Sequence, residues 1–169
     1  MFRRTYTFEF VSDLNAAPEA LWAHATDPAG INAELAPLAR MTFPRGANPL
    51  RAADLPLGRR LCRSWLLLFG LLPVDYDDLT LLRWRPGVEF LEVSTMLSQR
   101  EWQHHRLLTP LAGGGTRLAD AVRCEPRVRL LGPLYATVFR RAFALRHRNL
   151  RRKFGMCAIT PAAPRLAHP

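Results

Sequence analysis

Residues 101–125 read EWQHHRLLTPLAGGGTRLADAVRCE. Glycines at 113–115 separate two segments, 101–109 and 116–125, in which even-numbered side chains would share one face of a strand. Glycine also supplies the positive φ angles that a hairpin loop needs. The stretch therefore predicts two antiparallel strands joined by a short loop.

Three more strands are predicted upstream, over residues 61–72, 77–85 and 88–97. Pro86 and Gly87 occupy the central positions of a type II turn, so the last two of these strands should form a hairpin. Successive hairpins of this kind predict an antiparallel meander.

A strand and two short helices are predicted before the meander. Residues 2–13 alternate apolar and polar side chains, which is typical of a half-buried strand. Pro18 and Pro28 each suit the first turn of a helix, because the N–H that proline lacks would be unpaired there. Residues 41–60 are rich in proline and glycine and predict a short strand followed by a long loop.

A long amphipathic helix is predicted over residues 131–154. Its apolar side chains cover about half of the circumference at 100° per residue, so the helix should dock on an apolar surface. This apolar arc comprises Leu131, Leu134, Tyr135, Val138, Phe139, Ala142, Phe143, Leu145 and Leu150. The opposite arc comprises Arg140, Arg141, His147, Arg148 and Arg151.

This order of elements predicts an α+β fold in which a curved antiparallel sheet wraps around one long C-terminal helix. We expect a single domain over residues 1–155 and a loose tail over 156–169. The composition agrees, since 169 residues with 49% hydrophobic and 22% charged side chains are typical of a globular domain.

Several classes of protein are excluded or disfavoured. The longest apolar run, residues 65–74, is far shorter than the ~20 residues of a transmembrane helix. Residues 1–5 lack the apolar core of a signal peptide. Cys62, Cys124 and Cys157 have no C-x-x-C spacing and fit reduced thiols. We therefore expect a cytoplasmic protein with no metal and no cofactor.

Six strings carry a family resemblance: 15–22 (NAAPEALW), 72–74 (LPV), 85–90 (RPGVEF), 102–104 (WQH), 115–122 (GTRLADAV) and 146–147 (RH). In this order they resemble the START/polyketide cyclase (SRPBCC) superfamily, which has the helix-grip fold of the major birch-pollen allergen. The bacterial branch sometimes fused to an epimerase-like domain is the most similar. Its members often carry a second histidine where this chain has Arg106. The resemblance covers about residues 2–154 and implies a hydrophobic pocket between the sheet and the C-terminal helix, with no single chemistry.

Strand pairing predicts that a polar group lies inside this pocket. The expected cross-strand pairs are Met96–Trp102, Ser94–His104, Glu92–Arg106, His104–Asp120 and Trp102–Val122. Side chains alternate along a strand, so these even-numbered residues share one face, which we expect to be the concave one. Arg146 and Asn149 lie within the apolar arc of the helix, and Arg146 is expected to reach Glu92 or Asp120.

The first functional hypothesis is binding of a hydrophobic or amphipathic small molecule, lipid-like or polyketide-like, in this cavity. The alternative is a cyclase- or dehydratase-type enzyme on an aromatic or polyketide-like substrate, with His104 as a general base oriented by Asp120. A buried network that only fixes strand register explains the same polar residues. The expected ligand-binding residues are Phe8, Phe10, Phe90, Glu92, Met96, Trp102, His104, Arg106, Leu118, Asp120, Val122, Val138, Phe139, Ala142 and Arg146.

The basic charge is concentrated at the C-terminal end. Residues 1–125 carry 14 Arg and 14 acidic residues, so the net charge of +10 arises entirely within residues 126–169. Such a block suits an anionic membrane, which would contact Arg140, Arg141, Arg148, Arg151 and Arg152. A third hypothesis is an adaptor for nucleic acid or another anionic surface. Nucleic acid is disfavoured because no exposed aromatics are interleaved with the arginines, and a solvated helix face is the simplest alternative.

Overall fold

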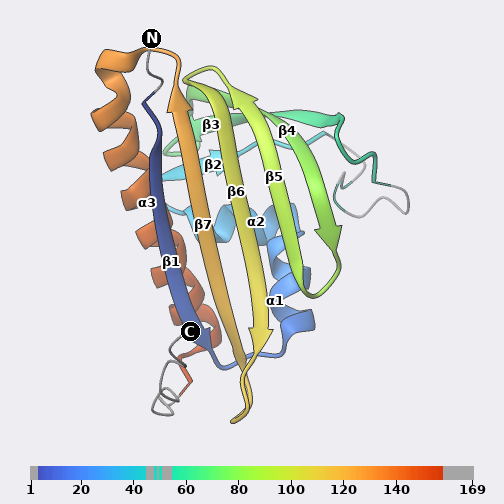
Figure 1. Ribbon diagram of the computed structural model, residues 1–169. Helices are drawn as coiled ribbons and strands as arrows, with labels where there is room; N and C mark the ends of the chain where they lie inside the picture. Colours follow the sequence, from blue (N-terminus) through green and yellow to red (C-terminus); the bar gives the residue numbers. More distant parts are fainter. Residues whose placement is uncertain (1–3, 45–47, 49, 51–54, 158–169) are drawn as a thin grey trace, which may run out of the picture.

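Seven antiparallel strands form one curved sheet in the order β1-β7-β6-β5-β4-β3-β2 (Figure 1). In the computed structural model, residues 4–44, 48, 50 and 55–157 are described. The strands are β1 (Tyr6–Leu14), β2 (Ala39–Met41), β3 (Arg60–Leu68), β4 (Leu72–Arg85), β5 (Glu89–Met96), β6 (Gln99–Pro110) and β7 (Thr116–Pro126). The helices are α1 (Pro18–Ala25), α2 (Pro28–Leu35), the short 3-10 helix η2 (Arg129–Leu131) and α3 (Gly132–Phe154).

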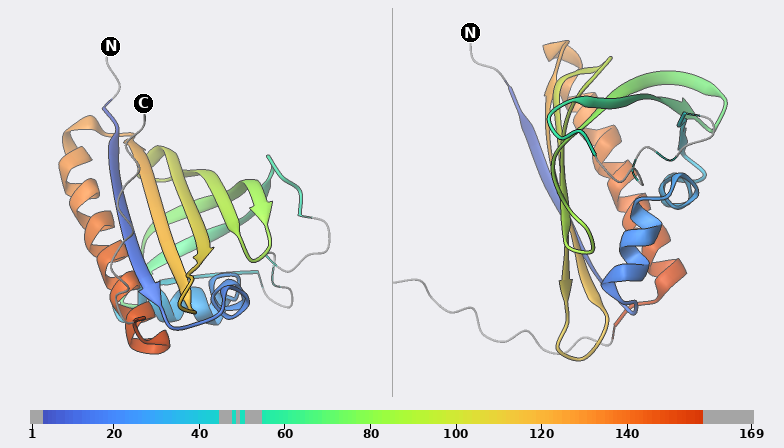
Figure 2. Two further views of the ribbon diagram at one scale, coloured as in Figure 1. Left: turned by 60° about the horizontal axis from the view of Figure 1, so that its bottom comes forward. Right: turned by 90° about the vertical axis from the view of Figure 1, so that its right-hand side faces the viewer.

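The three α-helices lie on the concave side of the sheet, and β3 and β4 curl over that side (Figure 2, right). The long helix α3 packs along β1 and contacts β7 and α2. A sheet that curls around a long helix is the predicted α+β helix-grip fold, which the structure confirms.

The two short helices begin where their prolines predict. Pro18 and Pro28 each occupy the first turn, and the Asp27 side chain caps α2 by accepting hydrogen bonds from the backbone N–H groups of Ala29 and Gly30. A Cβ at position 30 would lie 2.0 Å from the carbonyl oxygen of His24. Glycine at this position therefore lets α2 turn tightly back from α1, which orients the inner face of α2 toward the sheet.

Three apolar clusters fill the concave side. The aromatic cluster, between α3 and the sheet, comprises Phe8, Met96, Trp102, Val122, Cys124 and Phe143, with Tyr6, Phe10, Leu66 and Phe139 at its margin. A second cluster joins α2 to β3, β4 and β5 and includes Ile31, Leu35, Leu79, Leu81 and Phe90. The third lies at the far end of α3 and includes Leu14, Leu21, Leu108, Leu118 and Leu150.

The predicted strand pairing is wrong by two residues in both hairpins. The observed pairs are Ser94–Trp102, Glu92–His104, Phe90–Arg106, Arg106–Asp120 and His104–Val122. The β6–β7 loop is shorter than the predicted pairing requires, because pairing continues to Pro110–Thr116 and leaves only residues 111–115 between the strands. Between β5 and β6 only residues 97 and 98 form the turn. Because both shifts are even, every side chain keeps its predicted face.

The predicted strand 61–72 is interrupted. Phe69 and Gly70 adopt positive φ angles of 51° and 74°, and the chain turns there, so β3 ends at Leu68 and β4 begins at Leu72 rather than at 77. Because residues 65–74 are almost all apolar, the sequence pattern did not indicate a turn at this position. The hairpin exposes several of its apolar side chains, Leu71 most of all at 84%.

At the C-terminal end, Met156 bridges to Leu14 of β1. The backbone N–H of Cys157 donates to the carbonyl oxygen of Asp13 at 3.1 Å. The rest of the predicted tail, 158–169, lies outside the described residues, as do 45–47, 49 and 51–54 of the predicted loop. Across the described residues, no helix combines the length and the apolar character needed to cross a membrane.

Candidate functional site

Arg106 is the centre of a buried ionic network on the concave face. Its side chain is fully buried and forms two paired sets of hydrogen bonds. Nε and Nη2 of Arg106 donate to Asp120, its partner on β7, at 2.7 and 2.8 Å. Nη1 and Nη2 donate to Glu34 of α2 at 2.9 Å each. Paired guanidinium–carboxylate bonds are the strongest geometry for such an ion pair.

Both carboxylates of this network are held in the ionised form. Burial alone would raise the pKa of Glu34, but the guanidiniums of Arg106 and Arg146 hold it at about 2. Burial also opposes ionisation of Asp120, and Arg106 holds its pKa well below the ordinary value. An ionised carboxylate only accepts hydrogen bonds, so each group that contacts Asp120 must donate to it.

Two histidines donate to Asp120. His104 Nε2 lies 2.8 Å from Oδ1, and His147 Nε2 lies 3.0 Å from Oδ2. The other ring nitrogen of His147, Nδ1, lies 2.8 Å from Ser12 Oγ, which accepts from Arg151 Nη1 at 2.9 Å. His147 is therefore buried in the network, and its predicted place on the polar arc of the helix is wrong, because Ser12 and Asp120 offer partners on the inner side.

Nδ1 of His104 points toward a second pair of carboxyl groups. It lies 3.8 Å from Glu92 Oε2, beyond hydrogen-bond distance. Glu92 accepts from the Ser94 hydroxyl at 2.8 Å. Burial and the adjacent Glu92 raise the pKa of Asp77 well above its ordinary value. The pKa of Glu92 is lowered although burial opposes this, because His104 favours its charged form. The protonated form is thus favoured at Asp77 and the charged form at Glu92.

Arg146 does not reach Glu92 or Asp120 as predicted. Its Nε and Nη2 lie 3.0 and 2.8 Å from Glu34 Oε2, and its guanidinium carbon lies 4.8 Å from the centre of the Phe143 ring. Asn149, the other polar residue in the apolar arc, donates to the carbonyl oxygens of Glu34 and Ala36. Both residues thus attach α3 to α2.

A cavity of about 60 Å³ lies beside this network, between α2 and the strands β4, β5 and β6. Its polar wall consists of Glu92, His104 and Arg146. The remaining wall is apolar and comprises Ala25, Ile31, Met41, Phe43, Leu50, Leu79, Leu81, Trp84 and Phe90. Apolar walls with a few converging polar atoms are typical of small-molecule sites.

Of the predicted ligand-binding residues, Phe90, Glu92, His104 and Arg146 line this cavity. Arg106 and Asp120 are buried among the network bonds. The side chain of Val138 is 48% exposed, so its predicted place in the lining is wrong. Ala142 is half-buried. The others pack in apolar clusters instead: Phe8, Phe10, Met96, Trp102, Val122 and Phe139 in the aromatic cluster and Leu118 in the third cluster.

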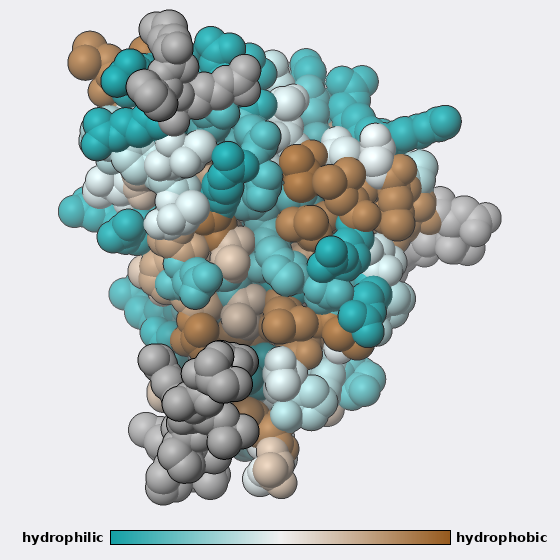
Figure 3. All heavy atoms as spheres, in the orientation of Figure 1, coloured by the Kyte–Doolittle hydropathy of each residue, from teal (hydrophilic) through white to brown (hydrophobic). Residues whose placement is uncertain are grey.

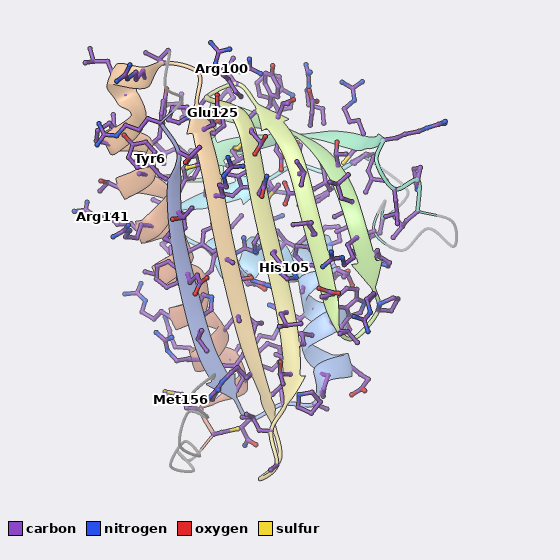
Figure 4. The ribbon with its side chains drawn as sticks, in the orientation of Figure 1. Tyr6, Arg100, His105, Glu125, Arg141 and Met156 are labelled. Carbon is purple, nitrogen blue, oxygen red and sulfur yellow. The ribbon has the colours of Figure 1, made fainter. Side chains whose placement is uncertain are left out.

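The sequence prediction missed Glu34, Asp77 and most of the apolar wall. A signal for Glu34 was present, since Ile31 and Leu35 predict a buried helix face that also includes residue 34. His105, the next residue along β6, lies on the outer face of the sheet (Figure 4), where its Nε2 lies 2.7 Å from Glu89 Oε2. Among the described residues no group of three His, Cys, Asp or Glu side chains could hold a metal ion.

Comparison with known proteins supports the fold. A family model described as a domain of unknown function (DUF8410) matches residues 12–154. No curated protein matches the chain significantly. A solved structure from Chromobacterium violaceum is 15% identical, covers 88% of this chain and 96% of its own, and has a TM-score of 0.64. A START superfamily protein from Mycobacterium smegmatis is 10% identical, with the same coverages and a TM-score of 0.63.

DynU16, a protein of the dynemicin biosynthetic locus, is 15% identical with a TM-score of 0.54; the match covers 88% of this chain and 48% of DynU16. At such identities the likeness is one of fold alone, and it agrees with the START/SRPBCC resemblance. Nothing in these comparisons singles out the branch fused to an epimerase-like domain. The chain therefore belongs to the DUF8410 family of domains of unknown function, and its fold is START-like.

Proposed function

We propose that this protein binds a small amphipathic molecule whose hydroxyl or amine group lies between Glu92 and His104. The observation that carries the proposal is the pair of atoms Glu92 Oε2 and His104 Nδ1, which are 3.8 Å apart at the wall of an otherwise apolar cavity. An oxygen or nitrogen about 2.8 Å from both atoms would complete a hydrogen bond to each.

The polarity of these atoms selects the ligand. The Glu92 carboxylate accepts hydrogen bonds, and its charged form is favoured because His104 lowers its pKa. A hydroxyl or amine group can donate to Glu92 and can also either donate to or accept from His104 Nδ1. A ligand carboxylate would instead face the charge of Glu92 directly. Arg146, the expected partner for an acidic ligand, is already bonded to Glu34.

The size of the cavity limits what enters it. At about 60 Å³ it is smaller than the roughly 150 Å³ cavity that holds benzene in another protein. It suits a polar end group with a few carbon atoms. A ring or a long acyl chain requires wall side chains such as Met41, Phe43 or Leu50 to move outward.

Native mass spectrometry of the purified protein, followed by organic extraction, tests this proposal. We expect a bound molecule with a hydroxyl or amine group. The same molecule should be absent from Ala25→Leu, which fills the cavity from α1. Binding at this site would be contradicted if the ligand persists in Ala25→Leu or if its only polar groups are carboxylates. It would also be contradicted if the wild-type protein has the mass of the unliganded chain in every preparation.

A second candidate function is acid–base catalysis at His104. The favouring observation is geometric, since Nε2 is held by Asp120 at 2.8 Å while Nδ1 faces the cavity. Binding remains the better supported function because Arg106 already neutralises Asp120, which weakens its effect on the basicity of His104. If the protein is an enzyme, His104→Gln should retain a molecule that the wild type converts into another. If it is a binding protein, the wild type and His104→Gln should contain the same chemical species, and the variant should bind it less tightly.

A further inference from the structure

Apolar side chains are exposed at the end of the molecule where α3 begins. Leu130 of η2 is 90% exposed, and Leu134 in the first turn of α3 is 58% exposed. Val128 and Leu97 are each about half exposed, at 51% and 53%. Figure 3 shows apolar side chains at the upper left, over the start of α3, next to hydrophilic ones. The β5–β6 turn, which contains Leu97, and the segment 128–134 thus expose large apolar side chains to solvent.

The two segments are joined by Arg127. Its backbone N–H donates to the carbonyl oxygen of Ser98, and its Nε donates to the carbonyl oxygen of Met96, both at 2.9 Å. These bonds fix the β5–β6 turn, with Leu97, beside the segment that leads into η2. The exposed groups therefore form one surface, which we call the docking tip: Leu97, Arg100, Arg127, Val128, Arg129, Leu130, Leu131 and Leu134.

The charge of the docking tip is positive. Arg127 and Arg129 are exposed, and Arg100 points away from the end of the sheet at the top of Figure 4. Beyond Glu125, which is buried, the sequence contains no acidic residue. Glu101, near this end, is paired with Arg123. Arg140 and Arg141 extend the exposed positive charge along α3.

We propose that the docking tip binds the surface of an anionic phospholipid membrane. The leucines would enter the boundary between headgroups and acyl chains, and the arginines would pair with lipid phosphates while their stems lie against the apolar layer. Nucleic acid would satisfy the arginines but offers no apolar phase for side chains as exposed as Leu130. This inference does not depend on the cavity, so either proposal can fail alone.

Co-sedimentation of the full chain with vesicles tests the inference. One set of vesicles contains phosphatidylcholine alone, and the other contains about 30% phosphatidylglycerol. The test variant, Leu130→Ser with Arg129→Gln, removes one leucine and one arginine from the docking tip. Its matched control, Leu57→Ser with Arg59→Gln, removes an exposed leucine and an exposed arginine elsewhere. Circular dichroism confirms that each variant is folded.

We expect the wild type and the control to sediment with the anionic vesicles and to be released by high salt. The tip variant should bind at least about tenfold more weakly, because it loses both an inserted apolar group and a charge near the membrane. Ala25→Leu should bind like the wild type. The proposal is overturned if the tip variant and the control lose vesicle binding equally, or if binding does not depend on anionic lipid. It is also overturned if the wild type does not sediment with vesicles, or if it binds duplex DNA more tightly than vesicles.

Discussion

Replacing Glu34 with glutamine tests the buried network at its most heavily bonded carboxylate. The side chain of Glu34 is 1% exposed and accepts hydrogen bonds from both Arg106 and Arg146. Glutamine keeps the shape but removes the charge, and it leaves Arg146 with no ionised partner within the described residues. Removing one partner from a buried ion pair typically costs about 3–5 kcal/mol.

The lowered pKa of Glu34 expresses the stabilisation of its charged form by Arg106 and Arg146. Its fall from 4.5 to about 2 corresponds to about 3 kcal/mol of folding free energy at neutral pH. For a domain of this size, the expected decrease in Tm is roughly 6–12 °C.

The pH dependence has a definite sign. A carboxylate with a depressed folded-state pKa stabilises the protein above its unfolded-state pKa, and this contribution disappears as the pH falls through the folded-state value. The difference in unfolding free energy between the wild type and Glu34→Gln should therefore be constant above pH 5 and should shrink between about pH 4.5 and 2. Urea unfolding monitored by tryptophan fluorescence measures this difference, with the exposed Glu19→Gln as control.

A loss of less than about 1 kcal/mol for Glu34→Gln at pH 7 would contradict the role of this carboxylate in holding Arg106 and Arg146. A difference in unfolding free energy between the two proteins that does not narrow in acid would contradict it equally.

Three further predictions concern the fold around the site. Gly115→Ala should destabilise the protein more than Gly114→Ala. Both residues have positive φ, but only at 115 would a Cβ meet the Leu14 carbonyl oxygen, at 2.4 Å. Equal decreases in Tm for the two variants in thermal unfolding would contradict this. Asp27→Ala should cost about 1 kcal/mol by removing the cap of α2, as measured by urea unfolding; no loss would show that the cap is dispensable. Burial raises the pKa of the Cys62 thiol to about 11. A thiol reagent at pH 8 should therefore label the partly exposed Cys157 before Cys62. Rapid labelling of Cys62 in the folded protein would contradict its burial.

The fold could be predicted because its signals are local. Alternation in the strands, glycines at the turns and the arc of α3 each depend on a few neighbouring residues. Pairing register depends on loop conformation, and the loop of residues 111–115 is shorter than the predicted pairing required. Because the error was even, Glu92, His104, Arg106 and Asp120 were nevertheless predicted on one face, which the structure confirms.

The site could be predicted only in part, because its partners come from distant elements. Glu34 lies 72 residues from Arg106, and only the packing of α2 against α3 brings it to both arginines. His147 was assigned to solvent because the sequence does not show that Ser12 and Asp120 lie on its side of the helix. The position of the cavity also follows from packing, since the aromatic cluster fills the space where a pocket was expected.

A titration with three four-carbon compounds, followed by ¹H–¹⁵N NMR, tests whether the cavity beside Glu92 and His104 selects hydroxyl and amine ligands. Butan-1-ol, butylammonium and butyrate differ only in the group presented to Glu92 and His104. We predict that the alcohol and the ammonium shift the indole signal of Trp84 and the backbone signals near His104, that butyrate does not, and that Ala25→Leu abolishes these shifts. Butyrate binding as well as butan-1-ol, or no shift with any of the three compounds, would contradict the assignment of this cavity as a site for hydroxyl or amine ligands.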